Sequence, residues 1–321
     1  MQPVHSPFHR ADLAFCSFRR YHFLESDKPE ENMILEAFAK INWSLDITGV
    51  RNDGYHLMDM LMQPVSIADE ITLSSAASLS VSVSGWPPVR EDETNLAYRA
   101  AEALKRVSGC QEGVAIHVKK RIPVGAGMGG GSSDAAAVLI GLNRLWHTGL
   151  SQEELEAIGL TLGADVPFFL RGGLTRTRGI GEKLEDIDCL YNYRLVMIQP
   201  CSGLSTAQVF HMWENAPDLK HPDNDAVESA LKNGQLSLLC ESIGNVLQPV
   251  AEKLRPAIVE ACNALNQQGA LVSAMTGSGS AVFGVFSSET TAGNAFRHLQ
   301  QRYRTIFLCH TQHDSIRISQ E

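Results

Sequence analysis

Five glycines within seven residues mark the part of this sequence that is best suited to chemistry. They lie in the segment 123–133, called the glycine loop below. Glycine accepts positive φ angles and lets backbone approach a ligand closely, so that successive N–H groups can converge on an anion. A helix beginning directly after the loop would add its unpaired N–H groups and the positive end of its dipole. The loop therefore predicts a phosphate site. The residues that we expect to contact phosphate are Pro123, Val124, Gly125, Ala126, Gly127, Met128, Gly129, Gly130, Gly131, Ser132 and Ser133.

The residues that flank these glycines support the same interpretation. Ser132 and Ser133 can cap the following helix, donate to phosphate oxygens or ligate magnesium. Lys119, Lys120 and Arg121 precede the loop and are expected to add local positive charge. The alternative is a flexible turn before a helix, which the density of glycines makes the weaker interpretation.

Two well-known phosphate loops do not fit the surroundings of this one. Gly125, Gly127 and Gly130 match the dinucleotide pattern GxGxxG, which is weak evidence alone. A dinucleotide loop opens its domain and is followed about 20 residues later by a strand ending in an acid. Here a helix signal stands at that place, and the loop lies deep inside the chain. No lysine follows the glycines, which excludes a Walker A loop.

Period-two and helical patterns indicate which elements position the loop. Val114, Ile116 and Val118 alternate as a strand before it, and residues 135–146 have helical spacing after it. Apolar residues alternate with polar ones over residues 37–47, which predicts a strand with Lys40 and Asn42 on the same side. Turn residues 51–54 lead into a second apolar stretch, 57–65.

The remaining patterns mix helices and strands without strict alternation, which favours an α+β fold over a doubly wound parallel sheet. Short strands are expected around Ile71 and Val81. Thr94 or Asn95 can cap one helix, and Ser151 with Glu154 forms a capping box for another. Further helices are expected over 205–213, 225–232 and 251–268. Strands are expected over 194–199 and 281–286, the second after a glycine-rich turn. A change of pattern near residue 190 indicates a domain boundary.

Composition limits the classes of function. The 321 residues carry a formal charge of −9, which argues against a nucleic-acid partner. No apolar run reaches the roughly 18 residues of a membrane span, so we expect no membrane partner. Seven scattered cysteines suit neither a zinc site nor a disulfide framework and favour a reducing, cytoplasmic location. Residues 1–33 read as an extension, either disordered or upstream of a true start at Met33; the second interpretation is favoured.

Four motifs together resemble the GHMP kinases, the family of galactokinase, homoserine kinase and mevalonate kinase. Residues 123–136 are similar to its P-x-x-x-G-L-G-S-S-A-A motif, with Met128 in place of leucine. The triple glycine, AKIN at 39–42 with DGYH at 53–56, LGADVP at 162–167 and MTGSGS at 275–280 resemble one group within the family. That group phosphorylates a cytidine-diphosphate-linked alcohol. The resemblance covers residues 34–310.

The resemblance implies a function and a set of site residues. The reaction would be ATP-dependent phosphorylation of the 2-hydroxyl of 4-diphosphocytidyl-2-C-methyl-D-erythritol in non-mevalonate isoprenoid precursor biosynthesis. Asp165 would be the general base and Lys40 the second catalytic residue, with ATP as co-substrate and Mg²⁺ bound by groups that we do not assign. The residues implied to bind the cytidine diphosphate substrate are Asn42, Tyr55, His56, Thr276, Gly277, Ser278 and Gly279.

The family fold would consist of two α+β domains with the active site in the cleft between them. Residues 34–190 would be the ATP-binding N-terminal domain and residues 191–321 the C-terminal domain, in a monomer or homodimer. The sequence departs from the family at Arg176 and Arg178, where small residues are usual and where arginines could alter a wall near the site. The alternatives are another GHMP small-molecule kinase and a catalytically silent ligand sensor with this fold. Asp165 could also be a plain helix cap.

Overall fold

The computed structural model describes residues 32–85, 89–189, 191–216 and 219–320. Residues 1–31 of the expected extension lie outside this range. Asn32 and Met33 form the beginning of the first strand, β1 (Asn32–Val50), and the Met33 side chain is buried. The last two residues of the expected extension therefore belong to the fold.

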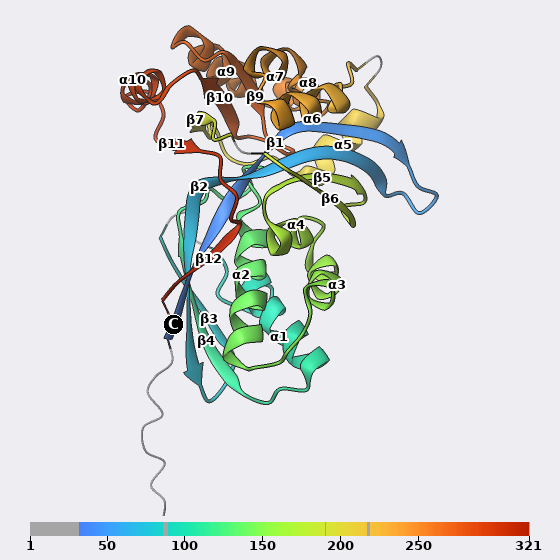
Figure 1. Ribbon diagram of the computed structural model, residues 1–321, viewed down its shortest axis with the longest axis vertical. Coiled ribbons are helices and arrows are strands. Elements are labelled where there is room, and N and C mark those ends of the chain that lie inside the picture. Colours follow the sequence, from blue (N-terminus) through green and yellow to red (C-terminus); the bar gives the residue numbers. More distant parts are fainter. Residues whose placement is uncertain (1–31, 86–88, 190, 217–218, 321) are drawn as a thin grey trace, which may run out of the picture. The chain divides into compact units, whose positions relative to one another are not determined.

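The larger of the two sheets is built around β1 and β2, which pair along almost their whole length. Its strand order is β12–β1–β2–β4–β3; β5 also pairs with β2 and with β6, and the short β8 pairs with β1. Its other strands are β2 (His56–Ala76), β3 (Ser80–Gly85), β4 (Gly113–Lys120), β5 (Leu174–Gly179), β6 (Lys183–Ile187), β8 (Gly244–Asn245) and β12 (Ile316–Gln320). Three register irregularities accompany a bend that carries β1 and β2 from one end of the fold to the other (Figure 1).

Strand β1 is buried on both faces between residues 37 and 47. The predicted alternation is confirmed over residues 39–43, where Ala39, Ile41 and Trp43 belong to one apolar core cluster. Ala37, Leu45 and Ile47 belong to another cluster, beyond register irregularities on either side. The polar face is buried as well, with Lys40 and Asn42 only 3% and 2% exposed. Burying polar groups costs free energy unless they find partners. The polar face of β1 is therefore expected to carry an organised network.

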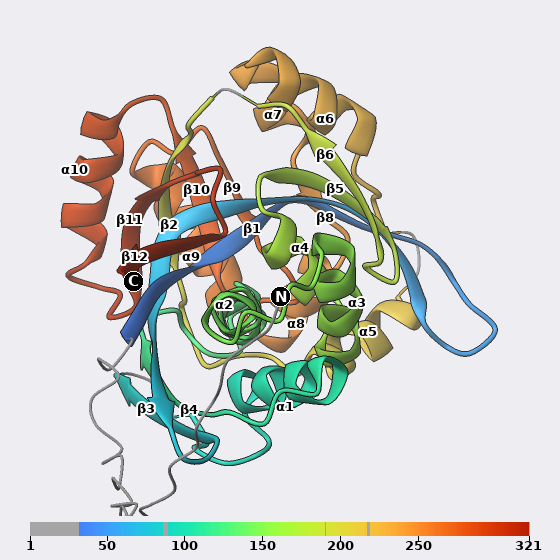
Figure 2. The same ribbon diagram turned by 60° about the horizontal axis from the view of Figure 1, so that its bottom comes forward.

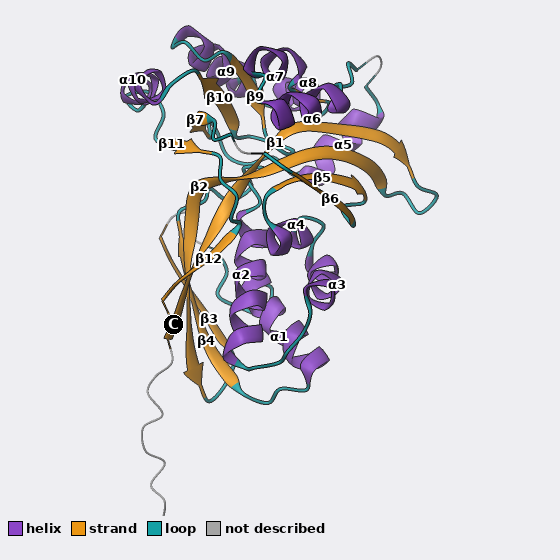
Figure 3. Ribbon diagram, in the orientation of Figure 1, coloured by secondary structure: helices purple, strands orange, loops and turns teal. Residues whose placement is uncertain are grey.

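Four helices cover one face of the larger sheet (Figures 1 and 3). Figure 2 looks along the central one, α2, which lies between the sheet and the other helices of this layer. These helices are α1 (Leu96–Ser108), α2 (Gly130–Leu145), α3 (Gln152–Leu162) and α4 (Val166–Arg171). Asn95, not Thr94, caps α1, and the capping box predicted from Ser151 and Glu154 opens α3.

The second sheet comes from the later part of the chain and has the order β11–β7–β10–β9, with every pair antiparallel. Its strands are β7 (Arg194–Ile198), β9 (Val272–Met275), β10 (Val282–Phe286) and β11 (Ile306–His310). The helices of this part are α5 (Thr206–Glu214), α6 (Asn224–Asn233), α7 (Leu236–Ser242), α8 (Gln248–Leu254), α9 (Ala257–Gln267) and α10 (Glu289–Leu299). Strand β12 then returns to pair with β1, so a single cut at residue 190 does not separate the two sheets. The domain boundary stays a prediction.

One predicted helix is two helices in the structure. Residues 251–268 were expected to be continuous, but α8 ends at Leu254 and α9 begins at Ala257. Pro256 disfavours helical geometry at the preceding residue, and Arg255 has φ −142° and ψ 89°. Helices α7 and α10 had no prediction. No helix in the described part of the chain is long and apolar enough to cross a membrane.

Candidate active site

The glycine loop joins β4 to α2, as its sequence predicts. Gly125, Gly127 and Gly129 all have positive φ angles of 65° to 77°. A Cβ on Gly127 would lie 2.2 Å from the Thr276 carbonyl oxygen, and one on Gly129 would lie 2.6 Å from the Phe169 ring. Gly129 also stands at the N-cap of α2 and provides no side-chain cap. The first N–H groups of α2 are therefore left for an anion.

Two cavities in the described part of the chain are lined by the glycines of this loop. The first, called the Asp165 cavity, has a volume of about 720 Å³; the second, called the loop cavity, has about 590 Å³. The loop cavity is lined by every glycine-loop residue except Ser133, and its apolar wall includes Val83, Leu96 and Val118. The residues common to both cavities are Gly125, Gly127, Gly129, Ser132 and Thr206. A ligand in one cavity can therefore meet a ligand in the other across the glycines.

Lys40 and Asn42 lie together in the Asp165 cavity, on the polar face of β1. The Lys40 ammonium donates to Asn42 Oδ1 over 2.5 Å. Burial lowers the pKa of Lys40, and the negative charge of Asp165 opposes that shift. The nearest acceptor of this ammonium is thus a neutral amide, and Asp165 acts on it as a charge within the same cavity.

Asn42 also fixes the turn at 276–280. Its Oδ1 accepts the Gly277 N–H over 3.0 Å, and its own N–H donates to Thr276 Oγ1 over 3.0 Å. Gly277 and Ser278 line the Asp165 cavity, as predicted. Thr276 is fully buried and is outside the residues that line the cavity, as is Gly279. These two predicted substrate residues therefore shape the turn, while Gly277 and Ser278 face the ligand space.

Asp165 precedes α4 as its N-cap residue but makes no side-chain capping bond. Its carboxylate instead faces the cavity that Lys40 lines. Pro167, at the start of α4, has a fixed φ suited to a first helical turn and helps to hold this bend. The geometry thus argues against the helix-cap alternative and leaves the carboxylate available for proton transfer.

Tyr55 and His56 come from the turn between β1 and β2 and both line the Asp165 cavity. The Tyr55 ring is 60% exposed, whereas the His56 ring packs 4.7 Å from Phe210 and 5.6 Å from Trp213. His56 Nε2 also lies 3.0 Å from Glu214 Oε1, without the alignment of a good hydrogen bond. His56 is therefore held by α5, while the Tyr55 ring is exposed, with the Arg51 guanidinium 5.9 Å from its centroid.

Several cavity residues had no prediction from the sequence. Helix α5 lies along the Asp165 cavity, although its helical pattern gave no sign of a role there. Met58 and Met60 of β2 line another part of the cavity wall. The unpredicted lining residues of the Asp165 cavity are Leu45, Met58, Met60, Ala164, Ile180, Leu204, Thr206, Ala207, Phe210, His211, Glu214 and Leu247.

The two serines of the loop have different positions. Ser132 lines both cavities. Ser133 is fully buried, and its hydroxyl donates to the Phe38 carbonyl over 2.7 Å. Ser133 therefore fastens α2 to β1 in this structure, and Ser132 is the serine placed to meet a ligand.

The basic run before the loop supplies less positive charge than expected. Lys120 is buried and paired with Asp69 and, over 2.7 Å, with Asp134. Lys119 lies 3.5 Å from Glu70. Asp69 Oδ1 also accepts the N–H groups of Arg121 and Ile122, over 2.5 and 2.9 Å. This cluster fixes the backbone at the entrance to the loop.

Asp134 has an unusual place in that cluster. Burial raises its pKa to about 7, against the opposing charge of Lys120. Its Oδ1 atom is buried without a hydrogen-bond partner among the described residues. Asp134 also lines the loop cavity.

No group of three or more His, Cys, Asp or Glu side chains in the described residues could hold a metal ion.

Comparisons with known proteins agree with this geometry. Residues 95–173 match the family description "GHMP kinases N terminal domain", and residues 216–305 match "GHMP kinases C terminal". The chain is 40% identical to the 4-diphosphocytidyl-2-C-methyl-D-erythritol kinase of Alkaliphilus metalliredigens, covering 85% of this chain and 94% of the relative. It is 37% identical to that of Clostridium tetani, covering 87% of this chain and all of the relative.

Solved structures give the same result. The crystal structure of a 4-(cytidine 5'-diphospho)-2C-methyl-D-erythritol kinase superimposes with a TM-score of 0.74 at 34% identity, over 87% of this chain and 99% of the other. A homoserine kinase from Cytophaga hutchinsonii shares the fold, with a TM-score of 0.71 at 16% identity over 92% and 99% of the two chains. The two family matches, the two relatives and the two solved structures all indicate the same family. The chain belongs to the GHMP kinase family, within its group of 4-diphosphocytidyl-2-C-methyl-D-erythritol kinases.

Proposed function

We propose that the chain transfers the γ-phosphoryl group of ATP to the 2-hydroxyl of 4-diphosphocytidyl-2-C-methyl-D-erythritol, in non-mevalonate isoprenoid precursor biosynthesis. The observation that carries this proposal is the meeting of two cavities at the glycine loop, with Lys40 and Asp165 on one side. Two substrates can approach the same glycines from opposite sides, as direct phosphoryl transfer requires.

ATP would occupy the loop cavity. Its phosphates would lie on the N–H groups of the loop and of the first turn of α2. The apolar wall of Val83, Leu96 and Val118 suits a purine ring. Mg²⁺ would arrive with the nucleotide, and the Ser132 hydroxyl is the loop side chain placed to hold it. The ion would neutralise charge on the transferring phosphates.

The acceptor alcohol would occupy the Asp165 cavity. Asp165 would take the hydroxyl proton as the new oxygen–phosphorus bond forms and the bond from the γ-phosphorus to the ADP oxygen breaks. The Asp165 charge would favour the protonated form of Lys40, and that ammonium would stabilise the negative charge that develops on the acceptor oxygen. Because Asn42 binds the same ammonium, it would aim that charge into the cavity.

Recognition of the cytidine group would fall to the turn between β1 and β2 and to the turn at 276–280. The exposed Tyr55 ring can stack on cytosine, and His56 can bond its edge. Asn42 can donate through Nδ2, whose present partner is the weak acceptor Met60 Sδ at 3.5 Å. Ser278 can offer its N–H to the diphosphate, whereas the Gly277 N–H is already bonded to Asn42 Oδ1.

We also propose a division into domains 34–190 and 191–321, a cytoplasmic location, and a monomer or homodimer. The six cysteines that the structure describes are free thiols, which supports a reducing compartment.

A coupled assay of ADP release would test the function. The expected result is turnover that requires ATP, Mg²⁺ and the cytidylated alcohol. Homoserine, mevalonate and the uncytidylated alcohol should give little turnover. Preferred turnover of any of these three would contradict the proposed acceptor, and ligand binding without any turnover would favour a silent sensor.

A further inference from the structure

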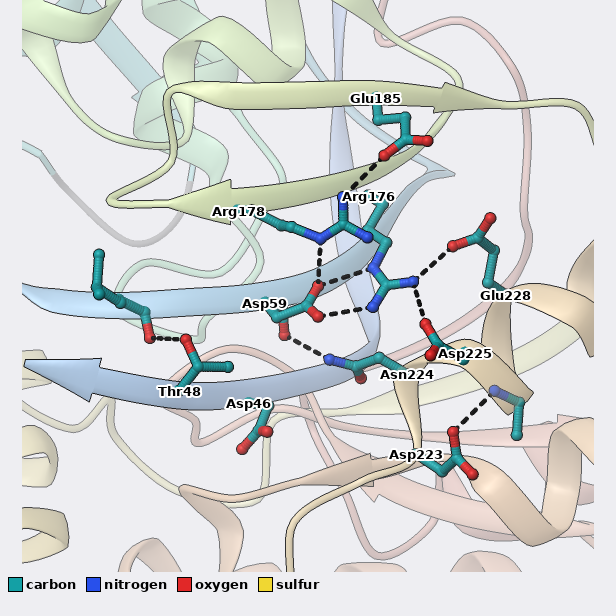
Figure 4. A network of polar contacts seen from close by, with 12 residues as sticks. Asp46, Thr48, Asp59, Arg176, Arg178, Glu185, Asp223, Asn224, Asp225 and Glu228 are labelled. Carbon is teal, nitrogen blue, oxygen red and sulfur yellow. Dashed lines mark hydrogen bonds and ion pairs between the residues drawn. The ribbon is translucent and has the colours of Figure 1, made fainter.

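A buried arginine gathers three carboxylates behind the wall of the Asp165 cavity (Figure 4). Arg176, on β5, is 7% exposed. It donates to Asp59 as a fork, from Nε to Oδ1 over 2.9 Å and from Nη2 to Oδ2 over 2.7 Å. Its Nη1 reaches α6, 2.6 Å from Asp225 and 2.7 Å from Glu228. One guanidinium thus links β5, β2 and α6.

The strand that Arg176 holds is the cavity wall itself. Asp59 stands on β2 between Met58 and Met60, and both methionines line the Asp165 cavity. Successive strand residues point to opposite faces, so Asp59 faces away from the cavity. The side chain of Asn224, the first residue of α6, donates to the Asp59 carbonyl over 3.0 Å. Helix α6 therefore contacts both the backbone and the charge of β2 at this residue.

A short path leads from this strand to the proposed chemistry. Met60 Sδ contacts Asn42 Nδ2 at 3.5 Å, and Asn42 Oδ1 accepts the Lys40 ammonium. His56 begins the same strand, three residues before Asp59. A displacement of β2 would therefore move both methionines and His56 and would disturb the Asn42 contact.

The charges explain why the arginine matters. Partial burial of Asp59 opposes its ionisation, but the hydrogen bonds from Arg176 hold its pKa below the ordinary value. The side chains of Asp59 and Glu228 are only 14% and 17% exposed. Without the arginine, two half-buried carboxylates on β2 and α6 would lose the cation between them. Lys232 would still lie 2.6 Å from Glu228 and Arg178 3.6 Å from Asp59, but neither of these cations pairs with both carboxylates. The charge link between β2 and α6 would therefore be lost, and we expect the two elements to separate.

We propose that Arg176 is a positioning residue for the acceptor: it clamps β2 to α6 and thereby keeps the methionine wall of the Asp165 cavity in shape. This inference rests on the proposed function, because it assigns the affected ligand as the acceptor alcohol. Neither the glycine loop nor the residues that line the loop cavity take part in the cluster.

Arg176→Met tests the clamp, with Arg178→Met as the matched control. Arg178 lies on the same strand but is 43% exposed, 3.6 Å from Asp59 and 2.8 Å from Glu185. We expect Arg176→Met to raise the KM for the acceptor about tenfold, with the KM for ATP within twofold and kcat within threefold of wild type. Arg178→Met should leave all three within twofold.

Two results would overturn the inference. One is an unchanged acceptor KM in Arg176→Met. The other is a fall in kcat together with a rise in the KM values for both substrates, which would indicate a general structural defect. If Arg176→Met does not fold, Glu228→Gln replaces it: this variant keeps the Asp59 fork and removes one arm to α6. It should raise the acceptor KM about threefold, less than Arg176→Met does, because the Asp59 fork remains. An unchanged KM would again contradict the clamp.

Amide hydrogen exchange separates this inference from the proposed function. If wild type does not turn over the cytidylated alcohol, the proposed function fails. The clamp is then decided by exchange at residues 57–62. Faster exchange there in Arg176→Met, with wild-type exchange in Arg178→Met, supports it, and equal exchange in the two variants overturns it.

Discussion

Two buried lysines, at the two sides of the glycine loop, have opposite electrostatic surroundings. Lys40 in the Asp165 cavity donates to the neutral amide of Asn42, and burial lowers its pKa. Lys120 in the loop cavity is paired with Asp69 and Asp134, whose charges raise its pKa despite burial. The exposed fractions of the two lysines are 3% and 5%. Burial therefore does not distinguish them; their partners do.

The difference separates a lysine that stabilises the fold from the lysine that we propose takes part in catalysis. A charge compensated by two carboxylates has little field left for a ligand, but it holds the loop entrance together. A buried ammonium bonded to a neutral amide is not neutralised, so its positive charge can act on a ligand in the cavity. Burying this charge lowers the stability of the fold. Proposed catalytic groups are thus expected where compensation is incomplete.

Asp165→Asn should give the largest effect, because it removes the only group that we assign as proton acceptor. We expect kcat to fall about 10³-fold, within the range for loss of a general base. ATP should bind as it does to wild type, since the loop cavity is untouched, and calorimetric titration with ATP would check this. Activity above a tenth of wild type would disprove the assignment of the base.

Lys120→Met should destabilise the fold by about 3–5 kcal/mol, because it leaves Asp69 and Asp134 buried without their cation. Equilibrium unfolding in urea measures this. Lys119→Met is the matched control; Lys119 is 55% exposed and should change stability by less than about 0.5 kcal/mol. Equal stability of the two variants would show that the Lys120 cluster is not structural.

Lys40→Met should lower kcat about 10²-fold, comparable to the loss of one electrostatic stabiliser of a transition state. Stability should stay unchanged or increase, in contrast to Lys120→Met. Because folding lowers the Lys40 pKa, the unfolded chain holds that proton more tightly than the folded chain. At pH values below the pKa of the folded chain, burying the charged Lys40 therefore lowers the stability of wild type. That destabilisation is lost as the pH rises toward 10.5. A marked loss of stability in Lys40→Met at pH 7 would contradict this.

Asp134→Asn should give the smallest effect, seen as a change in pH dependence. Folding raises the Asp134 pKa from 3.8 to about 7, so the folded chain holds the proton more tightly between these values. Wild type should therefore lose stability relative to the variant as the pH rises from 4 to 7. Urea unfolding at several pH values measures this difference, and parallel curves for the two proteins would rule it out.

Much of the site could be predicted because its signals are local. The five glycines of the loop were expected to allow positive φ angles; Gly125, Gly127 and Gly129 have them, whereas Gly130 and Gly131 begin α2. The alternation in β1 placed Lys40 and Asn42 on one side, and the Lys40–Asn42 hydrogen bond confirms it. Backbone conformation and strand alternation depend on a few neighbouring residues, which is why the sequence reveals them.

Other parts of the site are invisible in any single segment. The predicted phosphate loop included Ser133, whose hydroxyl is instead bonded to Phe38, 95 residues earlier in the chain. Arg176 and Arg178 stood out as departures from the family. Arg176 lies outside the lining of the Asp165 cavity and acts, in our proposal, from behind its wall. Contacts of this range depend on how strands and helices pack, and periodicity does not encode them.

The sequence by itself determined a glycine-rich loop before a helix, a strand with one polar face and the chemical types of the groups beside them. Only the tertiary structure decided which charges meet. Lys40 on β1 and Lys120 on β4 are the same residue type in one sheet, with β2 between their strands. Lys40 was expected beside the reacting hydroxyl and Lys120 beside the glycine loop. Asp69 and Asp134 reach Lys120 and not Lys40. Charge pairing acts over a few ångströms in space between residues far apart in sequence, so folding alone sets which lysine is compensated.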